Sequence, residues 1–166
     1  MTLEKLTLKA QDAIARAQQI ASEYAHQQIE PVHILQALLQ EREGLVPTIL
    51  KKIGLDLHVI ETSFDHEINR LPKLQGSAIS QIYLSNTSQK MLNQAMKYAH
   101  DLKDDYISTE HILLAIIQHA DDTAARILYE MVHCPFLGNN NACIQDSSRN
   151  HPAWPGPIYH FHQLPI

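Results

Sequence analysis

The sequence predicts an all-α fold made of two similar helical units. A shift of 78 residues aligns positions 6–54 with 84–132 without gaps, and 12 of those 49 positions are identical. Within each unit the apolar residues recur at spacings of three and four, which is typical of one face of an α-helix, and no stretch alternates as a strand would. We therefore expect two tandem four-helix repeats related by a pseudo-twofold axis.

The first helix of each repeat follows a capping residue. We expect one helix to start after Thr7 and the other after Ser85 (or Asn86), because their side-chain oxygens can accept hydrogen bonds from the first free backbone N–H groups. Small residues then recur in register in both helices, which favours close approach to a neighbouring helix. These register pairs are Ala17 with Ala95 and Ala21 with Ala99.

The second helix of each repeat starts near Pro31 or Thr109 and is apolar on most of its faces. A helix that is apolar nearly all round belongs in the centre of the core. Third helices are expected at about 46–53 and 122–132, and a fourth over roughly 56–70 in the first repeat. Each repeat therefore has its own hydrophobic helix at the centre and amphipathic helices around it.

A linker and a tail divide the rest of the chain. Proline, glycine and serines between the repeats indicate a linker. The expected organisation is a helical domain over 1–132, with repeat 1 at about 6–71, the linker at 72–83 and repeat 2 at about 84–132. The remaining residues, 133–166, form a Pro- and His-rich tail that we expect to be irregular or disordered.

The tail lacks the helix that the repeat predicts there. The 78-residue shift places an eighth helix at about 134–149, but that stretch contains proline and glycine and has no helical stripe. The last helix of repeat 2 is therefore expected to be missing or replaced, which should expose apolar surface around Ile116, Ile127 and Leu128. The chain is either a natural short protein with its own tail or one whose continuation was replaced by a frameshift or gene rearrangement.

Composition excludes several classes of function. A net charge of −5 gives no electrostatic reason to bind nucleic acid or an anionic membrane. Only two cysteines are present, so no disulfide framework is expected, and a cytoplasmic location is the plain inference. None of the five glycines precedes a lysine, so the G-x-x-x-x-G-K phosphate loop is absent. We expect no ATPase chemistry, no catalytic residue and no cofactor in this chain.

Several stretches resemble the Clp N-terminal repeat domain. The strongest are residues 6–11 (LTLKAQ), 29–35 (IEPVHIL) and 108–115 (STEHILLA). Within that family, residues 69–72 (NRLP) and 83–85 (YLS) are similar to ClpB rather than to ClpA or ClpC. The resemblance covers about residues 1–132 and implies the same fold of two four-helix repeats.

The resemblance also implies a function. In ClpB this domain is flexibly attached to a hexameric ATP-driven ring and helps to engage unfolded or aggregated protein. The expected role is a non-catalytic, substrate-engaging domain with unfolded or aggregated proteins as clients and a ClpB-type hexamer as a further partner. One alternative is a stand-alone adaptor or truncated fragment that docks on a Clp ATPase. Another, from a different class, is a metal-dependent or hydrolytic enzyme that uses the His-rich tail.

The resemblance assigns five candidate substrate-binding residues. By alignment Leu92 would lie in an apolar groove of the second repeat, and His111 stands where other members often carry a leucine. Polar positions linked to client handling match Thr7, Asp104 and Glu110. Each also has a purely structural interpretation. Thr7 caps a helix, Leu92 packs in the core, Glu110 interacts favourably with a helix dipole and Asp104 is a solvated loop carboxylate.

The histidines do not predict a metal site. His33 and His111 are repeat-equivalent, which indicates a shared structural role near a helix start. The ligand-type residues of the tail lack the C-x-x-C or H-E-x-x-H spacing that fixes a zinc geometry. Those tail residues are Cys134, Cys143, His160 and His162. No metal is therefore expected.

Overall fold

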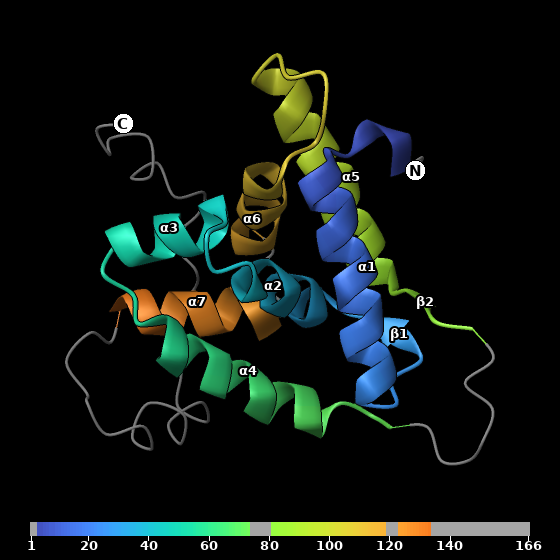
Figure 1. Cartoon of the computed structure of the whole chain (residues 1–166), viewed down its shortest axis with the longest axis vertical. Coiled ribbons are helices and arrows are strands. Elements are labelled where there is room, and N and C mark those ends of the chain that lie inside the picture. The colour runs from blue at the N-terminus through green and yellow to red at the C-terminus, as the bar shows by residue number, and fades with distance from the viewer. Residues whose placement is uncertain (1–2, 74–80, 119–122, 134–166) are drawn as a thin grey trace.

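The computed structural model describes residues 3–73, 81–118 and 123–133, which fold into helices joined by short turns (Figure 1). The predicted all-α fold class is confirmed. The expected eighth-helix position and the tail beyond residue 133 lie outside the described residues. In chain order the elements are η1 (Leu3–Lys5), α1 (Leu8–Glu23), β1 (Gln28–Ile29), α2 (Pro31–Gln40), α3 (Leu45–Lys52), α4 (Leu57–Arg70), β2 (Tyr83–Leu84), α5 (Asn86–Asp101), α6 (Thr109–Gln118) and α7 (Thr123–His133).

The repeat appears in the helix boundaries themselves. Both bounds of α5 lie 78 residues after those of α1, and both bounds of α6 lie 78 residues after those of α2. The capping expectation is also confirmed, because the side chains of Thr7 and Ser85 accept from the backbone N–H groups of Ala10 and Ser88. Local sequence therefore starts these helices at equivalent places.

The same turn ends α1 and α5. Ala25 and Lys103, which are 78 residues apart, both have a left-handed backbone, with φ of 59° and 62°. In each turn the next residue donates its N–H back to a helical carbonyl at 2.8 Å, from His26 to Ala21 and from Asp104 to Ala99. This bond satisfies a carbonyl that the helix end would otherwise leave free.

Replacing Lys103 with glycine should stabilise the protein by about 0.5–1 kcal/mol, because glycine adopts the left-handed conformation without steric strain. The matched control is Lys97→Gly on the exposed side of α5, which should cost about 1 kcal/mol. Urea unfolding at neutral pH measures both changes. A loss of stability in the Lys103 variant would contradict the assignment of the turn.

The first residues of each repeat pair with a backbone segment of the other repeat. Leu6 forms a parallel bridge with Ile107, and Leu84 pairs in parallel with Ile29 in the two-stranded sheet formed by β1 and β2. The two pairings exchange under the 78-residue shift, because Leu6 corresponds to Leu84 and Ile29 to Ile107. This reciprocity is what a pseudo-twofold axis requires. The strands were not predicted, since two residues are too few to show an alternating pattern.

The core is centred on α2 and α6, as their sequences predict. Every residue of α2 except Gln40 is buried. The small residues of the first helices allow close packing, with α1 against α2 and α5 against α6. The expected exposure of apolar residues in repeat 2 is wrong, because α7 packs against α2, α4 and α6. Exposed fractions are 0% for Ile116 and 4% for both Ile127 and Leu128.

None of the helices within the described ranges combines the length and apolar character needed to cross a membrane.

Candidate functional site

The predicted polar candidates gather where the two repeats exchange their first residues. We name the meeting of residues 5–8 with residues 102–111 the repeat-2 junction. The Thr7 N–H donates to the Ile107 carbonyl at 2.9 Å, and the Ile107 N–H donates to the Lys5 carbonyl at 2.7 Å. Thr7 is therefore held twice, by this bond and by its own cap on α1, in which its Oγ1 accepts from Ala10 N–H at 3.3 Å.

Asp104 and His111 are brought together at this junction. Asp104 Oδ2 lies 3.2 Å from His111 Nε2, with the histidine 1% and the carboxylate side chain 56% exposed. The Nδ1 atom of the same ring accepts the backbone N–H of Ser108 at 3.1 Å and lies 2.7 Å from the Ser108 hydroxyl. Seven residues separate Asp104 from His111, and the intervening turn places the carboxylate over the first turn of α6.

Ser108 contacts His111, and His111 contacts Asp104, as in the Ser–His–Asp triad of a hydrolase. The hydrogen bonds of the histidine ring, however, do not fit a catalytic base. A triad base needs a free ring nitrogen to take the serine proton. Here His111 Nδ1 already accepts a backbone N–H. In repeat 1, His33 Nδ1 accepts the Glu30 N–H at 2.9 Å in the same way, although no serine stands there. The shared histidine therefore closes the start of α2 and of α6, as the repeat-equivalence predicts.

The other two candidates lie apart from this contact. Glu110 is in the first turn of α6, half-buried, and its Oε2 accepts from the Thr109 hydroxyl at 3.4 Å. Leu92 is 1% exposed and belongs to the hydrophobic core. The described surface thus presents Thr7, Asp104 and Glu110 in part, but not the side chain of Leu92. The binding role of all five candidates, His111 included, stays a prediction.

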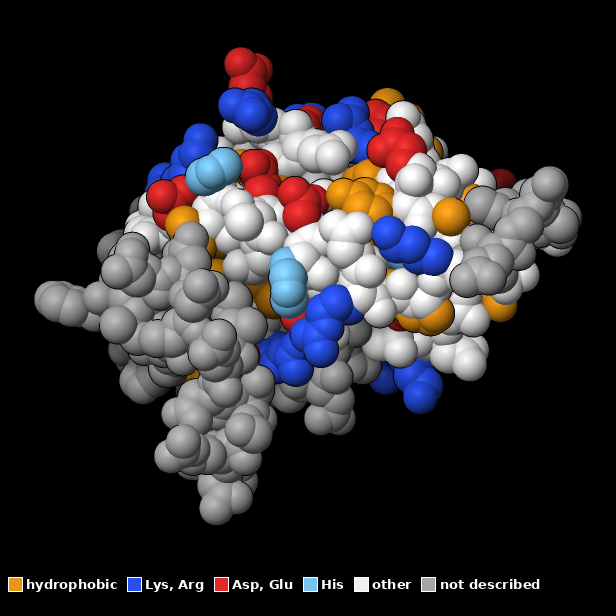
Figure 2. Space-filling model, turned by 90° about the horizontal axis from the view of Figure 1, so that it is seen from below, with side chains coloured by type: hydrophobic (Ala, Val, Ile, Leu, Met, Phe, Trp, Pro, Cys, Tyr) orange, Lys and Arg blue, Asp and Glu red, His pale blue; other side chains and the backbone are white. Residues whose placement is uncertain are grey.

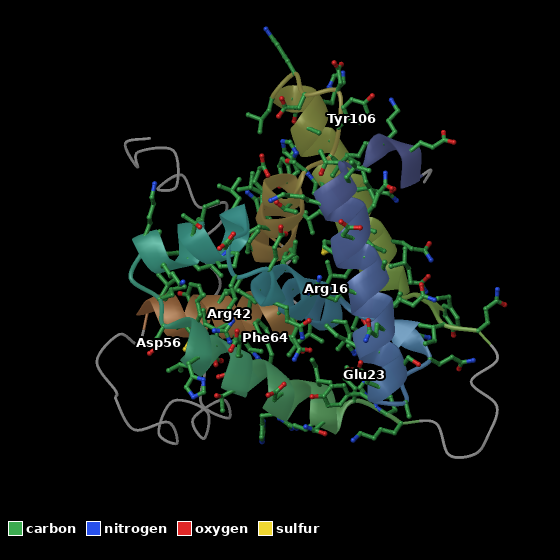
Figure 3. All side chains as sticks on the ribbon, in the orientation of Figure 1. Arg16, Glu23, Arg42, Asp56, Phe64 and Tyr106 are labelled. Atoms are coloured by element: carbon green, nitrogen blue, oxygen red, sulfur yellow. The ribbon has the colours of Figure 1, made fainter. Side chains whose placement is uncertain are left out.

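Exposed apolar side chains belong to both segments of the repeat-2 junction. Leu8, Leu102 and Tyr106 are 78%, 55% and 58% exposed, and they lie on the segments that meet there. Figure 3 places Tyr106 at the end of the molecule where the α5–α6 loop approaches the start of α1. We name these three residues the apolar rim. Their counterparts in repeat 1 under the 78-residue shift are Asn86, Tyr24 and Gln28.

The apolar rim was not predicted from the sequence. Leu8 and Leu102 lie at helix ends, where a helical stripe does not show which side chains are covered. A position-by-position comparison of the two repeats would have found it, because apolar residues in one repeat face polar ones in the other at two of the three positions. The rim is therefore a property of the repeat-2 junction and not of the fold that both repeats share.

The equivalent place in repeat 1 holds a buried histidine pair. His26 Nδ1 lies 2.9 Å from His33 Nε2, and the two side chains are 2% and 0% exposed. Burial, with a smaller contribution from His26, lowers the pKa of His33 to about 4. Burial and the nearby Lys73 ammonium also lower the pKa of His26. Both rings are therefore neutral at pH 7, whereas Asp104 supplies a carboxylate at the position equivalent to His26.

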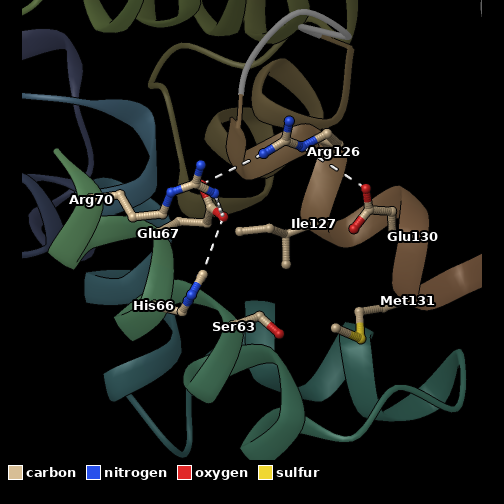
Figure 4. A pocket seen from close by; sticks show the side chains of 8 residues that line it. All are labelled: Ser63, His66, Glu67, Arg70, Arg126, Ile127, Glu130 and Met131. Carbon is tan, nitrogen blue, oxygen red and sulfur yellow. Dashed lines mark hydrogen bonds and ion pairs between the residues drawn. The ribbon is translucent and has the colours of Figure 1, made fainter. Parts of the chain in front are cut away.

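A pocket of about 200 Å³ lies between α4 and α7 (Figure 4). Its charged groups pair with one another: Glu67 accepts from Arg70 at 3.1 Å, and its other oxygen lies 3.6 Å from Arg126. Glu130 lies 3.9 Å from the same Arg126. This network joins the helices of two different repeats, and the local charges are balanced. The charged residues of this pocket therefore link the two repeats through ion pairs of balanced charge.

The surface seen from the α4 side carries charges of both signs. In Figure 2 the visible apolar areas on this face are small and separate from one another. Such a mixed surface is ordinary for a soluble domain and does not mark a binding site. The apolar rim remains the more informative surface.

Within the described ranges, no group of three His, Cys, Asp or Glu residues is placed to hold a metal ion. The tail residues with metal-ligand chemistry, Cys134, Cys143, His160 and His162, lie outside those ranges.

Comparison with known proteins relates this geometry to a family. Residues 5–131 match the Clp repeat (R) N-terminal domain. The chain is 38% identical over 130 residues to chaperone protein ClpB of Clostridium tetani, and the alignment covers 77% of this chain and 15% of that protein. The chain therefore spans a small part of the length of this relative.

Two solved structures share the fold. The Hsp104 N-terminal domain from Candida albicans superimposes with a TM-score of 0.67 at 22% identity, covering 78% of this chain and 82% of that one. A ClpV N-domain in complex with a VipB peptide gives a TM-score of 0.64 at 20% identity, covering 78% and 80%. At such low identity these similarities show the fold alone.

Proposed function

The chain belongs to the Clp repeat (R) N-terminal domain family, and from this premise we propose that it engages exposed apolar segments of unfolded or aggregated proteins. Domains of this family are non-catalytic N-terminal parts of Clp ATPases and bind substrates or partners for them. In this proposal the chain captures a segment of the client, and a ClpB-type hexamer supplies the ATP-driven work.

The observation that carries the proposal is the apolar rim. A side chain such as Leu8, which is 78% exposed, gains free energy when a partner covers it, because apolar surface leaves water. Three such side chains around one junction, against largely polar counterparts at the other, favour a site for apolar segments on repeat 2. The complex of a ClpV N-domain with a VipB peptide supports the idea that this fold can hold a peptide.

The polar candidates fit the same site. Thr7 is fixed beside Leu8 by its cap and by its bond to Ile107, and Asp104 follows Leu102 by two residues. We propose that their remaining hydrogen-bonding capacity contacts the backbone of the bound segment. Backbone contacts hold any sequence and would contribute affinity, whereas selectivity would come from the apolar rim.

Replacing the apolar rim with serines should weaken client binding about tenfold or more without unfolding the domain, because exposed side chains contribute little to stability. The measurement is fluorescence anisotropy with a labelled, permanently unfolded protein, such as reduced and carboxymethylated α-lactalbumin. A matched control changes three similarly exposed apolar residues elsewhere. The test variant is Leu8→Ser, Leu102→Ser and Tyr106→Ser, and the control is Leu45→Ser, Met96→Ser and Val132→Ser.

Equal affinity of the rim variant and the control would contradict the proposed site. If the chain binds an intact ClpB hexamer but no unfolded client, the adaptor alternative is favoured instead. Nuclear magnetic resonance adds the location, because shifts on client addition should concentrate at the backbone amides of residues 5–8 and 102–111.

A further inference from the structure

The start of α2 fixes the proton positions on two buried histidines. His33 Nδ1 accepts the Glu30 backbone N–H at 2.9 Å, so that nitrogen carries no proton. The neutral ring must then carry its proton on Nε2, which lies 2.9 Å from His26 Nδ1. His26 Nδ1 is therefore the acceptor, and the proton of the neutral His26 ring is on its own Nε2.

This relay ends on a donor without an acceptor. His26 is 2% exposed, and its Nε2 has no hydrogen-bond partner among the described residues. A buried N–H without a partner is costly, typically by about 1–3 kcal/mol, so such a group calls for an acceptor that arrives from elsewhere. His26 is also one of the residues that line an open pocket.

The pocket has the chemistry to hold such an acceptor. It encloses about 230 Å³ at the turn between α1 and α2, with the end of α4 as its other wall. A second donor residue, Lys73, also lines it. The Lys73 ammonium donates to Asn69 Oδ1 at 3.2 Å and lies 5.9 Å from the centre of the Tyr24 ring. The carboxylate of Glu30 also lines the pocket, but its Oε2 already accepts from Ser85 at 2.8 Å. The full lining is His26, Gln27, Gln28, Glu30, Leu71, Pro72 and Lys73.

We propose that this repeat-1 pocket binds a carboxylate of a peptide, with one oxygen on His26 Nε2–H and the other on the Lys73 ammonium. A carboxylate suits two donors because it has two acceptor oxygens, whereas a carboxamide oxygen can serve only one of them fully. Lys73 also balances the charge of Glu30, so the incoming anion does not meet a net negative site. The carboxylate comes from an acidic side chain or from a chain terminus.

In this proposal the two repeats share one fold but present opposite hydrogen-bonding groups to a ligand. In repeat 2 the position of His26 is occupied by Asp104, whose 56% exposed carboxylate lies 3.2 Å from Nε2 of the equivalent His111. This contact is within ion-pair distance but lacks the geometry of a hydrogen bond. The repeat-1 pocket presents donors where the repeat-2 junction presents an acceptor. The proposed pocket does not depend on the apolar rim, and each can fail without the other.

The test titrates the whole chain with three peptides of equal length that differ in their carboxylate groups. The first is amidated and has one internal glutamate, the second replaces that glutamate with glutamine, and the third is the glutamine peptide with a free C-terminal carboxylate. Isothermal titration calorimetry should show the first, the third or both binding about tenfold or more tighter than the second. Whichever carboxylate peptide binds more tightly identifies the source. Equal binding of all three, or no binding, overturns the proposal.

Three charge-matched variants locate the site. His26→Asp copies the natural arrangement of repeat 2, so it keeps an acceptor for His33 while it removes the donor from the pocket. Lys73→Gln replaces the charged ammonium donor with a shorter, neutral amide at an exposed side chain, and Lys52→Gln removes a positive charge from the exposed side of α3 as the control. The first two should abolish the preference for carboxylate peptides, and the control should retain it. Retention in all three overturns the proposal.

A direct readout separates the pocket from general charge effects. Long-range nitrogen–proton spectra of the histidine rings should show His26 and His33 both protonated on Nε2 in the free protein. Addition of the favoured peptide should shift the His26 Nε2 signal and leave the amides of Leu8 and Tyr106 unmoved. If the His26 signal stays in place at saturation, only water occupies the pocket and the proposal fails. The amides of Leu8 and Tyr106 respond instead if the apolar rim alone binds peptides.

Discussion

Replacing Leu92 with alanine should lower the free energy of unfolding by about 2–5 kcal/mol, the cost of a cavity in a close-packed core. Leu92 is 1% exposed and lies on the buried face of α5. Urea unfolding followed by far-UV circular dichroism measures the loss. The same chemical change at Leu102, which is 55% exposed, should cost less than about 0.5 kcal/mol.

The pair of variants also separates stability from binding. We expect Leu102→Ala to weaken client binding while the domain keeps its stability, since Leu102 belongs to the apolar rim. We expect Leu92→Ala to show the reverse, with unchanged affinity per folded molecule. Full stability with lost binding in the Leu92 variant would contradict its place in the core and would support its predicted role in the groove.

The helices were predictable from the sequence because their signals are local. Thr7 and Ser85 bond to backbone groups three residues away, so the capping pattern alone places the starts of α1 and α5. The apolar surface of α2 likewise predicts its central place, whatever surrounds it. The 78-residue repeat then transfers both results from one repeat to the other.

The site was less predictable because it depends on distant parts of the chain. Leu6 meets Ile107 across a hundred residues, and neither sequence shows a strand pattern. The histidine contacts depend on a turn that carries residue 26 or 104 back over the start of the next helix. Only the spacing of seven between His26 and His33, repeated between Asp104 and His111, hints at them.

Leu92 shows why a resemblance and a helical pattern must be weighed together. The resemblance predicts a groove position, whereas the stripe of α5 places it between Met91 and Ala95 on the buried face. Burial agrees with the stripe, because the spacing of apolar residues reports directly which face of a helix is covered. The apolar rim could not be found in this way, since helix ends and turns carry no such period.

Acid should destabilise the protein through His33 well before most carboxylates are protonated. The ring has an ordinary pKa of 6.5 when unfolded and about 4 when folded, because burial opposes its charged form. Between these two pKa values the ring is protonated in the unfolded chain but not in the folded chain. The contribution to stability is therefore complete above pH 6.5 and is lost progressively as the pH falls toward 4, by about 3 kcal/mol in all. The lowered pKa of His26 acts in the same direction.

The variant His33→Asn isolates this contribution. Its side-chain oxygen can still accept the Glu30 N–H, so the start of α2 keeps its closure while the titrating ring is gone. The variant should be less stable than the parent at pH 7, but the difference should shrink by roughly 2–3 kcal/mol by pH 4.5. Urea unfolding at a series of pH values measures this change. A difference that stays constant over this range would mean that the folded chain protonates His33 as readily as the unfolded chain, which would contradict its lowered pKa.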